Sequence, residues 1–205
     1  MRPAPKLTVA IAILGSAAVG YWMRKHPSAM SYAQRFFTEL PHPLITRSRL
    51  QKVLEPKPGE KVLEIGPGTG YYTLGMAEWV GPEGNVEILD VRPEFLDHTM
   101  RRVRSRGLTN VKATNGDAQR LPYEDDCFDA VVLIAVLGEI PDQAAALREL
   151  RRALKPGGRL VVGELFPPDP HMTSFGSLRP RAESAGFKFE RRVGPPFGYF
   201  ARFGA

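Results

Sequence analysis

The feature that most constrains the fold of this chain is a glycine-rich turn that directly follows a short apolar strand. Residues 63–70 read Leu-Glu-Ile-Gly-Pro-Gly-Thr-Gly, so glycine alternates at Gly66, Gly68 and Gly70. Glycine is needed where a backbone turns tightly beside a ligand, because a Cβ atom would block the approach or forbid a positive φ. Asp90 ends the next apolar stretch, about 20 residues further on. An acid there can accept hydrogen bonds from both ribose hydroxyls, so the two features together predict a nucleotide site.

The spacing of these glycines bears on which nucleotide binds. A dinucleotide-binding turn has the pattern G-x-G-x-x-G, whereas Tyr71 stands here in place of the third glycine. Glu64 precedes the turn, where its charge would repel a pyrophosphate but could pair with the ammonium group of an amino-acid-like ligand. These residues resemble the first motif of the class I S-adenosylmethionine-dependent methyltransferases, E/D-x-G-x-G-x-G. The resemblance implies S-adenosylmethionine as cofactor and S-adenosylhomocysteine as product.

Three further segments resemble motifs of the same family, so that the matches together cover residues 45–165. Residues 115–118 are similar to its adenine-binding turn, in which an acid meets the exocyclic amine. Residues 128–133 resemble its fourth strand, and 154–162 the turn into its fifth. The predicted cofactor-binding residues are Glu64, Gly66, Pro67, Gly68, Gly70, Asp90, Val91, Asp117, Ala118 and Leu121.

From residue 59 onward, apolar stretches of strand length alternate with segments of helical length. Strands are predicted over 61–65, 86–89, 111–114, 130–134 and 159–164, and helices over 72–80, 93–106 and 143–153. Such alternation implies a parallel doubly wound sheet. A helix over 173–185 and strands over 188–193 and 199–203 would add the antiparallel hairpin of the family. We therefore expect an α/β fold with a Rossmann-like doubly wound seven-stranded sheet, preceded by an N-terminal apolar helix.

The N-terminal region differs in kind from the rest of the chain. Residues 7–23 carry no charge, and basic residues flank them on both sides. A helix of this length would span about 25 Å, a little short of a ~30 Å hydrocarbon core. Tyr21 and Trp22 could anchor it at the interface, so we expect a single membrane span. A cleaved secretory signal and a buried core helix are the alternatives.

These features divide the chain into an anchor, residues 1–26, and a methyltransferase domain, residues 27–205. Within the domain we expect lid or linker helices over 27–58, the cofactor-binding core over 59–165, and a substrate-side segment with the hairpin over 166–205. An amphipathic helix is predicted over 29–40 and another helix over 46–54. The flanking charges do not determine the orientation of the anchor, and cofactor supply favours a catalytic domain in the cytoplasm.

Glu139 is the one candidate catalytic residue. Methyl transfer from a sulfonium is an in-line displacement, so alignment of donor and acceptor can supply most of the acceleration. Glu139 follows the fourth strand, where related enzymes often carry a histidine near the transferring methyl. It could accept a proton from a hydroxyl or thiol acceptor, or it could be a solvated loop acid.

Composition argues against metal and nucleic-acid partners. Four histidines and one cysteine, Cys127, are scattered without metal-ligand spacing, so no metal is predicted. The net charge is +6, but the arginines of residues 101–106 point in different directions around a helix. That arrangement is typical of a solvated helix end, and a basic surface near a membrane attracts anionic headgroups.

These observations predict a membrane-anchored methyltransferase that acts on a small, lipophilic acceptor. The nucleophile could be O, S, N or C, and lipid headgroups, quinones, phenols and thiols all fit. The sequence does not indicate an oligomeric state. A non-catalytic nucleotide-binding scaffold is the main alternative. A nicotinamide-dependent oxidoreductase is a second one, which Tyr71 disfavours.

Overall fold

The computed structural model of the protein describes residues 27–39, 43–165 and 171–205. The predicted membrane segment, residues 7–23, and the apolar helix expected there lie outside these ranges. No helix within the described ranges combines the length and the hydropathy that a bilayer crossing requires.

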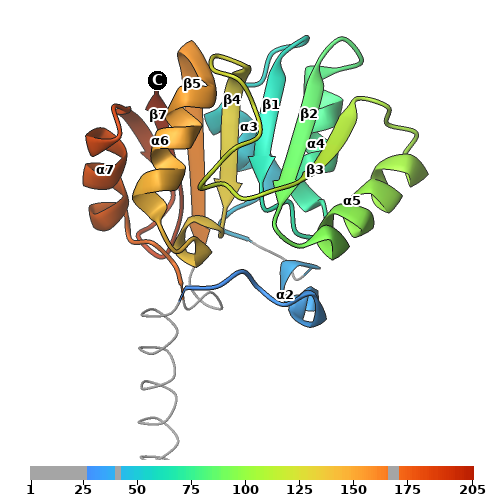
Figure 1. The fold of residues 1–205 in the computed structure, drawn as a ribbon, viewed down its shortest axis with the longest axis horizontal. Coiled ribbons are helices and arrows are strands. Elements are labelled where there is room, and N and C mark those ends of the chain that lie inside the picture. The colour runs from blue at the N-terminus through green and yellow to red at the C-terminus, as the bar shows by residue number, and fades with distance from the viewer. Residues whose placement is uncertain (1–26, 40–42, 166–170) are drawn as a thin grey trace, which may run out of the picture.

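A seven-stranded sheet forms the centre of the domain (Figure 1). The strands are β1 (Lys61–Ile65), β2 (Asn85–Asp90), β3 (Val111–Asn115), β4 (Phe128–Ile134), β5 (Leu154–Leu165), β6 (Lys188–Val193) and β7 (Gly198–Gly204). Their order is β3-β2-β1-β4-β5-β7-β6; the first five strands run parallel, and β7 is antiparallel to both of its neighbours. The predicted Rossmann-like doubly wound sheet with a C-terminal antiparallel hairpin is confirmed. We call the edge at which β1 to β5 end the carboxyl edge, and the opposite one the amino edge.

Helices cover both faces of the sheet. Side chains of α3 (Arg47–Leu54), α4 (Tyr71–Val80) and α5 (Pro93–Ser105) pack in one hydrophobic cluster, and those of α6 (Gln143–Ala153) and α7 (Phe175–Ser184) in another. Figure 1 shows α6 in front of the sheet and α3 and α4 behind it. Leu147 and Leu150 of α6 are fully buried, and such burial contributes about 1.5–3 kcal/mol per side chain. The core therefore consists of two apolar layers, one on each face.

The element boundaries follow the sequence prediction except in two places. Strand β5 starts at Leu154 instead of 159, because the chain already pairs with β4 there, Leu154 opposite Phe128, before a register shift. The helix predicted over 29–40 is wrong as a continuous element. The chain forms a short 3₁₀ turn, η1 (Tyr32–Gln34), and the single turn α2 (Phe36–Glu39).

The physical reason lies in the backbone groups of this segment, which we call the strap (residues 27–39). The carbonyl oxygen of Ala29 accepts a hydrogen bond from Arg92, and the N–H of Met30 donates one to Glu139. The bond from Arg92 takes the place of the helical bond that the Ala29 carbonyl would otherwise accept, whereas the N–H of Met30 would have no partner within a helix that starts at residue 29. The strap runs along the carboxyl edge, and α2 lies below the sheet in Figure 1.

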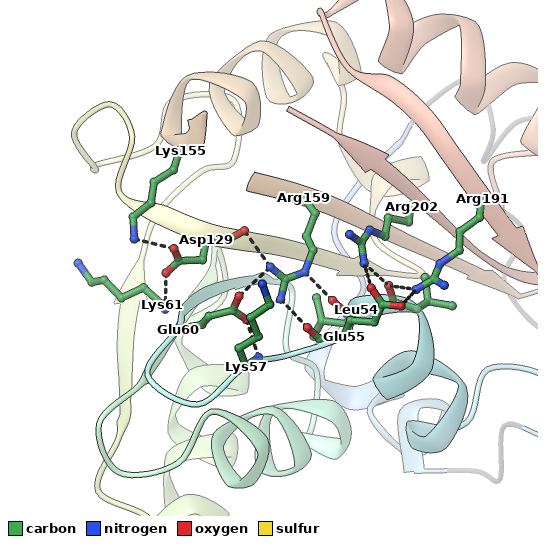
Figure 2. Close-up of polar contacts among 11 residues, drawn as sticks. Leu54, Glu55, Lys57, Glu60, Lys61, Asp129, Lys155, Arg159, Arg191 and Arg202 are labelled. Carbon is green, nitrogen blue, oxygen red and sulfur yellow. Dashed lines mark hydrogen bonds and ion pairs between the residues drawn. The ribbon is translucent and has the colours of Figure 1, made fainter. Parts of the chain in front are cut away.

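A buried ionic cluster holds the opposite, amino edge together (Figure 2). Arg159, at 7% exposure, donates from both Nη atoms to the carboxylate of Glu60. It also donates to the carbonyl oxygens of Leu54, Glu55 and Asp129. One guanidinium thereby ties the end of α3, the turn before β1, and strands β4 and β5 to one another.

Candidate active site

A cavity of about 730 Å³ opens at the carboxyl edge. Its walls come from the strap and from the segments that follow β1, β2, β3 and β4. β2 and β3 lie on one side of β1, and β4 and β5 lie on its other side, so the direction in which strands are added reverses between β1 and β4. Ligands of open parallel sheets bind at such a reversal, outside the carboxyl ends of the strands.

Most of the predicted site residues meet at this cavity. Those in its lining are Glu64, Gly66, Pro67, Gly68, Asp90, Val91, Asp117, Ala118 and the candidate catalytic residue Glu139. Two predicted cofactor-binding residues, Gly70 and Leu121, are not part of the lining. Gly70 precedes α4 as its N-cap, and Leu121 is 5% exposed and packs in the core with α6 and α7.

The turn after β1 requires its glycines for two reasons. Gly66, Gly68 and Gly70 have φ values of 66°, 56° and 81°, in the left-handed region that L side chains avoid. A Cβ atom on Gly66 would lie 2.5 Å from Cγ2 of Val136, in the segment after β4. A side chain at Gly66 would therefore push apart two walls of the cavity.

Glu64 is a buried acid in the cavity wall. It is 3% exposed, and Thr73, one turn into α4, donates a hydrogen bond from Oγ1 to its carboxylate. Burial raises the pKa of Glu64 to about 7, although the bond from Thr73 acts in the opposite direction. A cation brought next to Glu64 would favour the charged form and lower this pKa again.

Two further acids follow β2 and β3. Asp90 accepts the backbone N–H of Arg92 at 2.8 Å, and burial raises its pKa to about 6. Asp117 is exposed and accepts hydrogen bonds from the backbone and side-chain nitrogens of Gln119 at 2.9–3.0 Å. Both carboxylates stabilise turns and also line the cavity.

The strap closes one side of the cavity, and four hydrogen bonds hold it there. They join Met30 N to Glu139 Oε2 (2.9 Å), Arg92 Nη2 to Ala29 O (3.0 Å), Tyr32 Oη to His98 Nδ1 (3.0 Å) and Thr38 Oγ1 to Thr69 Oγ1 (3.2 Å). Tyr32 also packs edge-on against Phe95, with ring centroids 5.3 Å apart. Glu139 thus bonds to the strap at the cavity wall.

Sequence reasoning missed two residues of the site. Thr73, the hydrogen-bond partner of Glu64, lies nine positions after it. Its hydroxyl in the first turn of the helix after the glycine turn is the sequence feature that could have identified it. Ala135 lines the cavity at a φ of 54°, with its N–H bonded to the carbonyl of Gly163 at 2.8 Å. A left-handed alanine is strained, and no local residue pattern marks it.

The donor set of the cavity suits an organic cation better than a metal ion. Within the described parts of the chain, no three His, Cys, Asp or Glu side chains are grouped so that they could hold a metal ion. The three acids are separated along the carboxyl edge, at the ends of β1, β2 and β3. They match a ligand that offers an ammonium group, ribose hydroxyls and an amine in a row.

Comparison with solved structures shows the same fold. A SAM-dependent methyltransferase from Aquifex aeolicus superimposes with a TM-score of 0.79 at 22% identity, covering 86% of this chain and 99% of that one. The [4+2]-cyclase SpnF superimposes with a TM-score of 0.65 at 27% identity, over 72% of this chain and 57% of that one. The reactions named for these two proteins differ, so the fold by itself does not determine the chemistry.

Sequence comparison identifies the family. A demethylmenaquinone methyltransferase from Bacillus cytotoxicus is 35% identical over 122 residues, which are 60% of this chain and 52% of that protein. The chain thus spans about half the length of this relative. The model of the ubiE/COQ5 methyltransferase family matches residues 40–175, which include the whole glycine turn and the four acids that line the cavity. The chain therefore belongs to the ubiE/COQ5 methyltransferase family.

Proposed function

We propose that this protein transfers a methyl group from S-adenosylmethionine to a small, lipophilic acceptor. One observation carries the proposal: Glu64, Asp90 and Asp117 line a single cavity beside a glycine turn with positive φ values. Their order along the edge matches the ammonium group, the ribose hydroxyls and the adenine amine of this cofactor. Glu64 would pair with the ammonium, Asp90 with the ribose, and Asp117 with the amine.

The residues of this chain would bind and align the reactants. S-adenosylmethionine, when bound, would supply an electrophilic methyl group: the methyl–sulfur bond would break with its electron pair left on sulfur, the acceptor would form the new bond to the methyl carbon, and the proton that the acceptor loses would pass to solvent. Gly66 and Gly68 let the backbone approach the cofactor, while the strap excludes water from one side of the cavity. Alignment of this kind can account for most of the acceleration without a proton-transfer residue.

A quinol ring is the acceptor class to test first. The cavity is lined in part by apolar and aromatic side chains, among them Ile45, Tyr71, Tyr72, Val136 and Leu165. A flat aromatic ring would pack well against such a surface. The name of the Bacillus cytotoxicus relative, a demethylmenaquinone methyltransferase, supports the same class.

We also propose that residues 7–23 anchor the protein in a membrane, with the domain of residues 27–205 in the cytoplasm. The proposal rests on the uncharged run with its basic flanks, and on the cytoplasmic supply of S-adenosylmethionine. Extraction of a membrane fraction with carbonate tests it. An anchored protein stays in the pellet, whereas release into the supernatant would contradict anchoring.

Calorimetric titration of the full-length protein in mild detergent tests the cofactor. We expect S-adenosylmethionine and S-adenosylhomocysteine to bind, and NAD and NADH to give no heat. Asp90→Ala should weaken binding by about 1–3 kcal/mol through lost hydrogen bonds to the ribose. Absence of binding to the folded protein would overturn the proposal, and binding of NADH would favour the oxidoreductase.

The scaffold alternative needs a second measurement. Release of S-adenosylhomocysteine in the presence of a short-chain demethylated quinol would reject it. Cofactor binding without any release, across quinol, phenol and thiol acceptors, would favour a binding module instead.

A further inference from the structure

The exposed large hydrophobic side chains of the described residues gather at one edge of the molecule. They are Phe36 (52% exposed), Val91 (48%), Val193 (38%) and Phe197 (53%). Single exposed apolar residues are common on soluble proteins and need no explanation. Their confinement to one edge is the feature that needs one.

The sheet register places three of the four residues at the carboxyl edge. Val91 directly follows β2, which ends there. Gly198, the first residue of β7, pairs with Leu165, the last of β5, so the turn that contains Phe197 lies at the same edge. Val193 pairs with Phe200 near that turn.

Phe36 reaches this edge through the strap. It lies in α2, and the side chain of Thr38 in the same helical turn bonds to Thr69 in the loop after β1. The amino edge has a different character: the ionic cluster around Arg159 occupies it, with paired charges from five separate segments (Figure 2). The two edges therefore differ in polarity.

The first described residues of the chain, which follow the uncharged run in sequence, lie at the same edge. Ala29 and Met30, just after the start of the described strap, bond to Arg92 and Glu139 beside the cavity. Only residues 24–28 separate them from the uncharged run of residues 7–23. A membrane segment in that run would bring the bilayer to the carboxyl edge.

Two exposed arginines stand next to the apolar residues in the chain. Arg35 precedes Phe36, and Arg192 precedes Val193. Paired apolar and cationic side chains are typical of surfaces that lie at a lipid interface. There, rings and methyl groups enter the headgroup layer while guanidinium groups contact phosphates.

We propose that the carboxyl edge is a lipid-facing surface, on which Phe36, Val193 and Phe197 enter the headgroup layer of the bilayer, while Val91 stays at the cavity that it lines. The cavity opens at this edge, so a lipophilic acceptor would reach it from the membrane without crossing water. The inference rests on the proposed membrane attachment and adds to it which face of the domain meets the lipid.

Depth-dependent quenching tests this orientation in the full-length protein. Cys127→Ser removes the lone cysteine, and Phe36→Cys or Phe197→Cys then carries an environment-sensitive fluorophore. Lys188→Cys, exposed at the start of β6 on the amino edge, is the matched control. The protein is reconstituted in vesicles of phosphatidylcholine and phosphatidylglycerol, with and without nitroxide-labelled lipids.

We expect the probes at positions 36 and 197 to lose more than half of their emission to the nitroxide lipids, and the probe at 188 to lose almost none. If the probes at all three positions lose the same fraction of their emission to the nitroxide lipids in vesicle-bound protein, the proposal is overturned. The emission of the probe at position 197 could instead shift to shorter wavelength with rising protein concentration, without quenching by the nitroxide lipids. That result would also overturn the proposal, and it would indicate that a second copy of the chain covers this face. Calorimetry with S-adenosylhomocysteine on the same samples distinguishes failure of this proposal from failure of the proposed function. If the cofactor product binds but the probes are not quenched, the lipid-facing orientation is wrong and the proposed function is unaffected.

Discussion

Glu64 is a cavity acid whose protonation state changes near neutral pH. It is almost fully buried, lines the cavity, and has a pKa raised to about 7 by burial. Its proposed partner, the ammonium of S-adenosylmethionine, binds the carboxylate and not the neutral acid. The protonation of Glu64 should therefore lower cofactor affinity first as the pH falls, followed near pH 6 by that of Asp90.

We expect the affinity for S-adenosylmethionine to fall as the pH drops through about 7, approaching a tenfold loss per unit below it. Glu64→Gln should bind weakly at every pH and show a flatter profile. Adenosine, which lacks the ammonium, is the control ligand, and its affinity should not follow Glu64. Calorimetry between about pH 8 and pH 6 measures all three. An unchanged affinity of the native protein for the cofactor across this range would contradict the assignment.

The stability of the ligand-free protein should change in the opposite direction. The folded pKa of Glu64 lies above its unfolded value, so the folded state binds the proton more tightly. The contribution of Glu64 to the free energy of unfolding therefore rises as the pH falls from about 7 toward about 4.5. Denaturant midpoints of the native protein and Glu64→Gln, compared at several pH values, isolate this contribution.

The glycine turn offers a second test at the scale of one residue. Gly66 and Gly107 both have positive φ, at 66° and 67°, but no atom lies within 4 Å of a Cβ built on Gly107. Alanine at either position should lower stability by about 1–2 kcal/mol through backbone strain. Only Gly66→Ala should also lose cofactor binding, because its Cβ collides with Val136 in the cavity wall. Cofactor titration of the two variants separates strain from close approach, and equal affinities would contradict this account.

At the scale of elements, the strap gives Glu139 a role other than proton transfer. The carboxylate accepts the N–H of Met30, so it holds the strap beside the cavity. Glutamine keeps a carbonyl oxygen at this position and alanine does not. We expect Glu139→Ala to bind cofactor roughly tenfold more weakly and to release S-adenosylhomocysteine faster, through loss of a hydrogen bond to a charged group. Glu139→Gln should stay close to the native protein.

Stopped-flow release of S-adenosylhomocysteine and steady-state turnover distinguish the two roles of Glu139. A proton acceptor would lose turnover in both variants, because an amide is not a base. If Glu139→Gln turns over as slowly as Glu139→Ala with unchanged cofactor release, the strap assignment is wrong and the role as a base gains support.

At the scale of the whole molecule, Arg159 in β5 joins three parts of the chain that are distant in sequence: residues 54–60, the start of β4, and β5 itself. Its guanidinium is 9% exposed and pairs with Glu60, 99 positions away. Removal of one partner from a buried ion pair typically costs about 3–5 kcal/mol, so Arg159→Ala should strongly lower the free energy of unfolding. Lys155→Ala breaks a pair with Asp129 whose lysine is 41% exposed, and should cost less than about 1 kcal/mol. Urea denaturation of both variants measures the difference, and similar midpoints would contradict the argument.

Much of the fold could be predicted because its signals are local. Buried parallel strands such as β1 and β4 are mostly apolar, and the glycine turn and Asp90 occur at fixed spacing. The strap could not be predicted, since its partners Arg92 and Glu139 lie 63 and 109 positions away along the chain. The same holds for Ala135, whose left-handed backbone depends on its place between β4 and β5. The position of the strap and the backbone conformation of Ala135 both depend on contacts between residues far apart in the chain, which a local sequence pattern does not reveal.

The bond between Met30 and Glu139 makes one backbone amide an indicator of site occupancy. The strap borders the cavity along the loops that follow β1, β2 and β4, so we expect a ligand in the cavity to stabilise the bound strap. The exchange of the Met30 amide hydrogen with deuterium should therefore slow when the cavity fills. Mass spectrometry of a single peptide could then rank cofactors and acceptors without an activity assay.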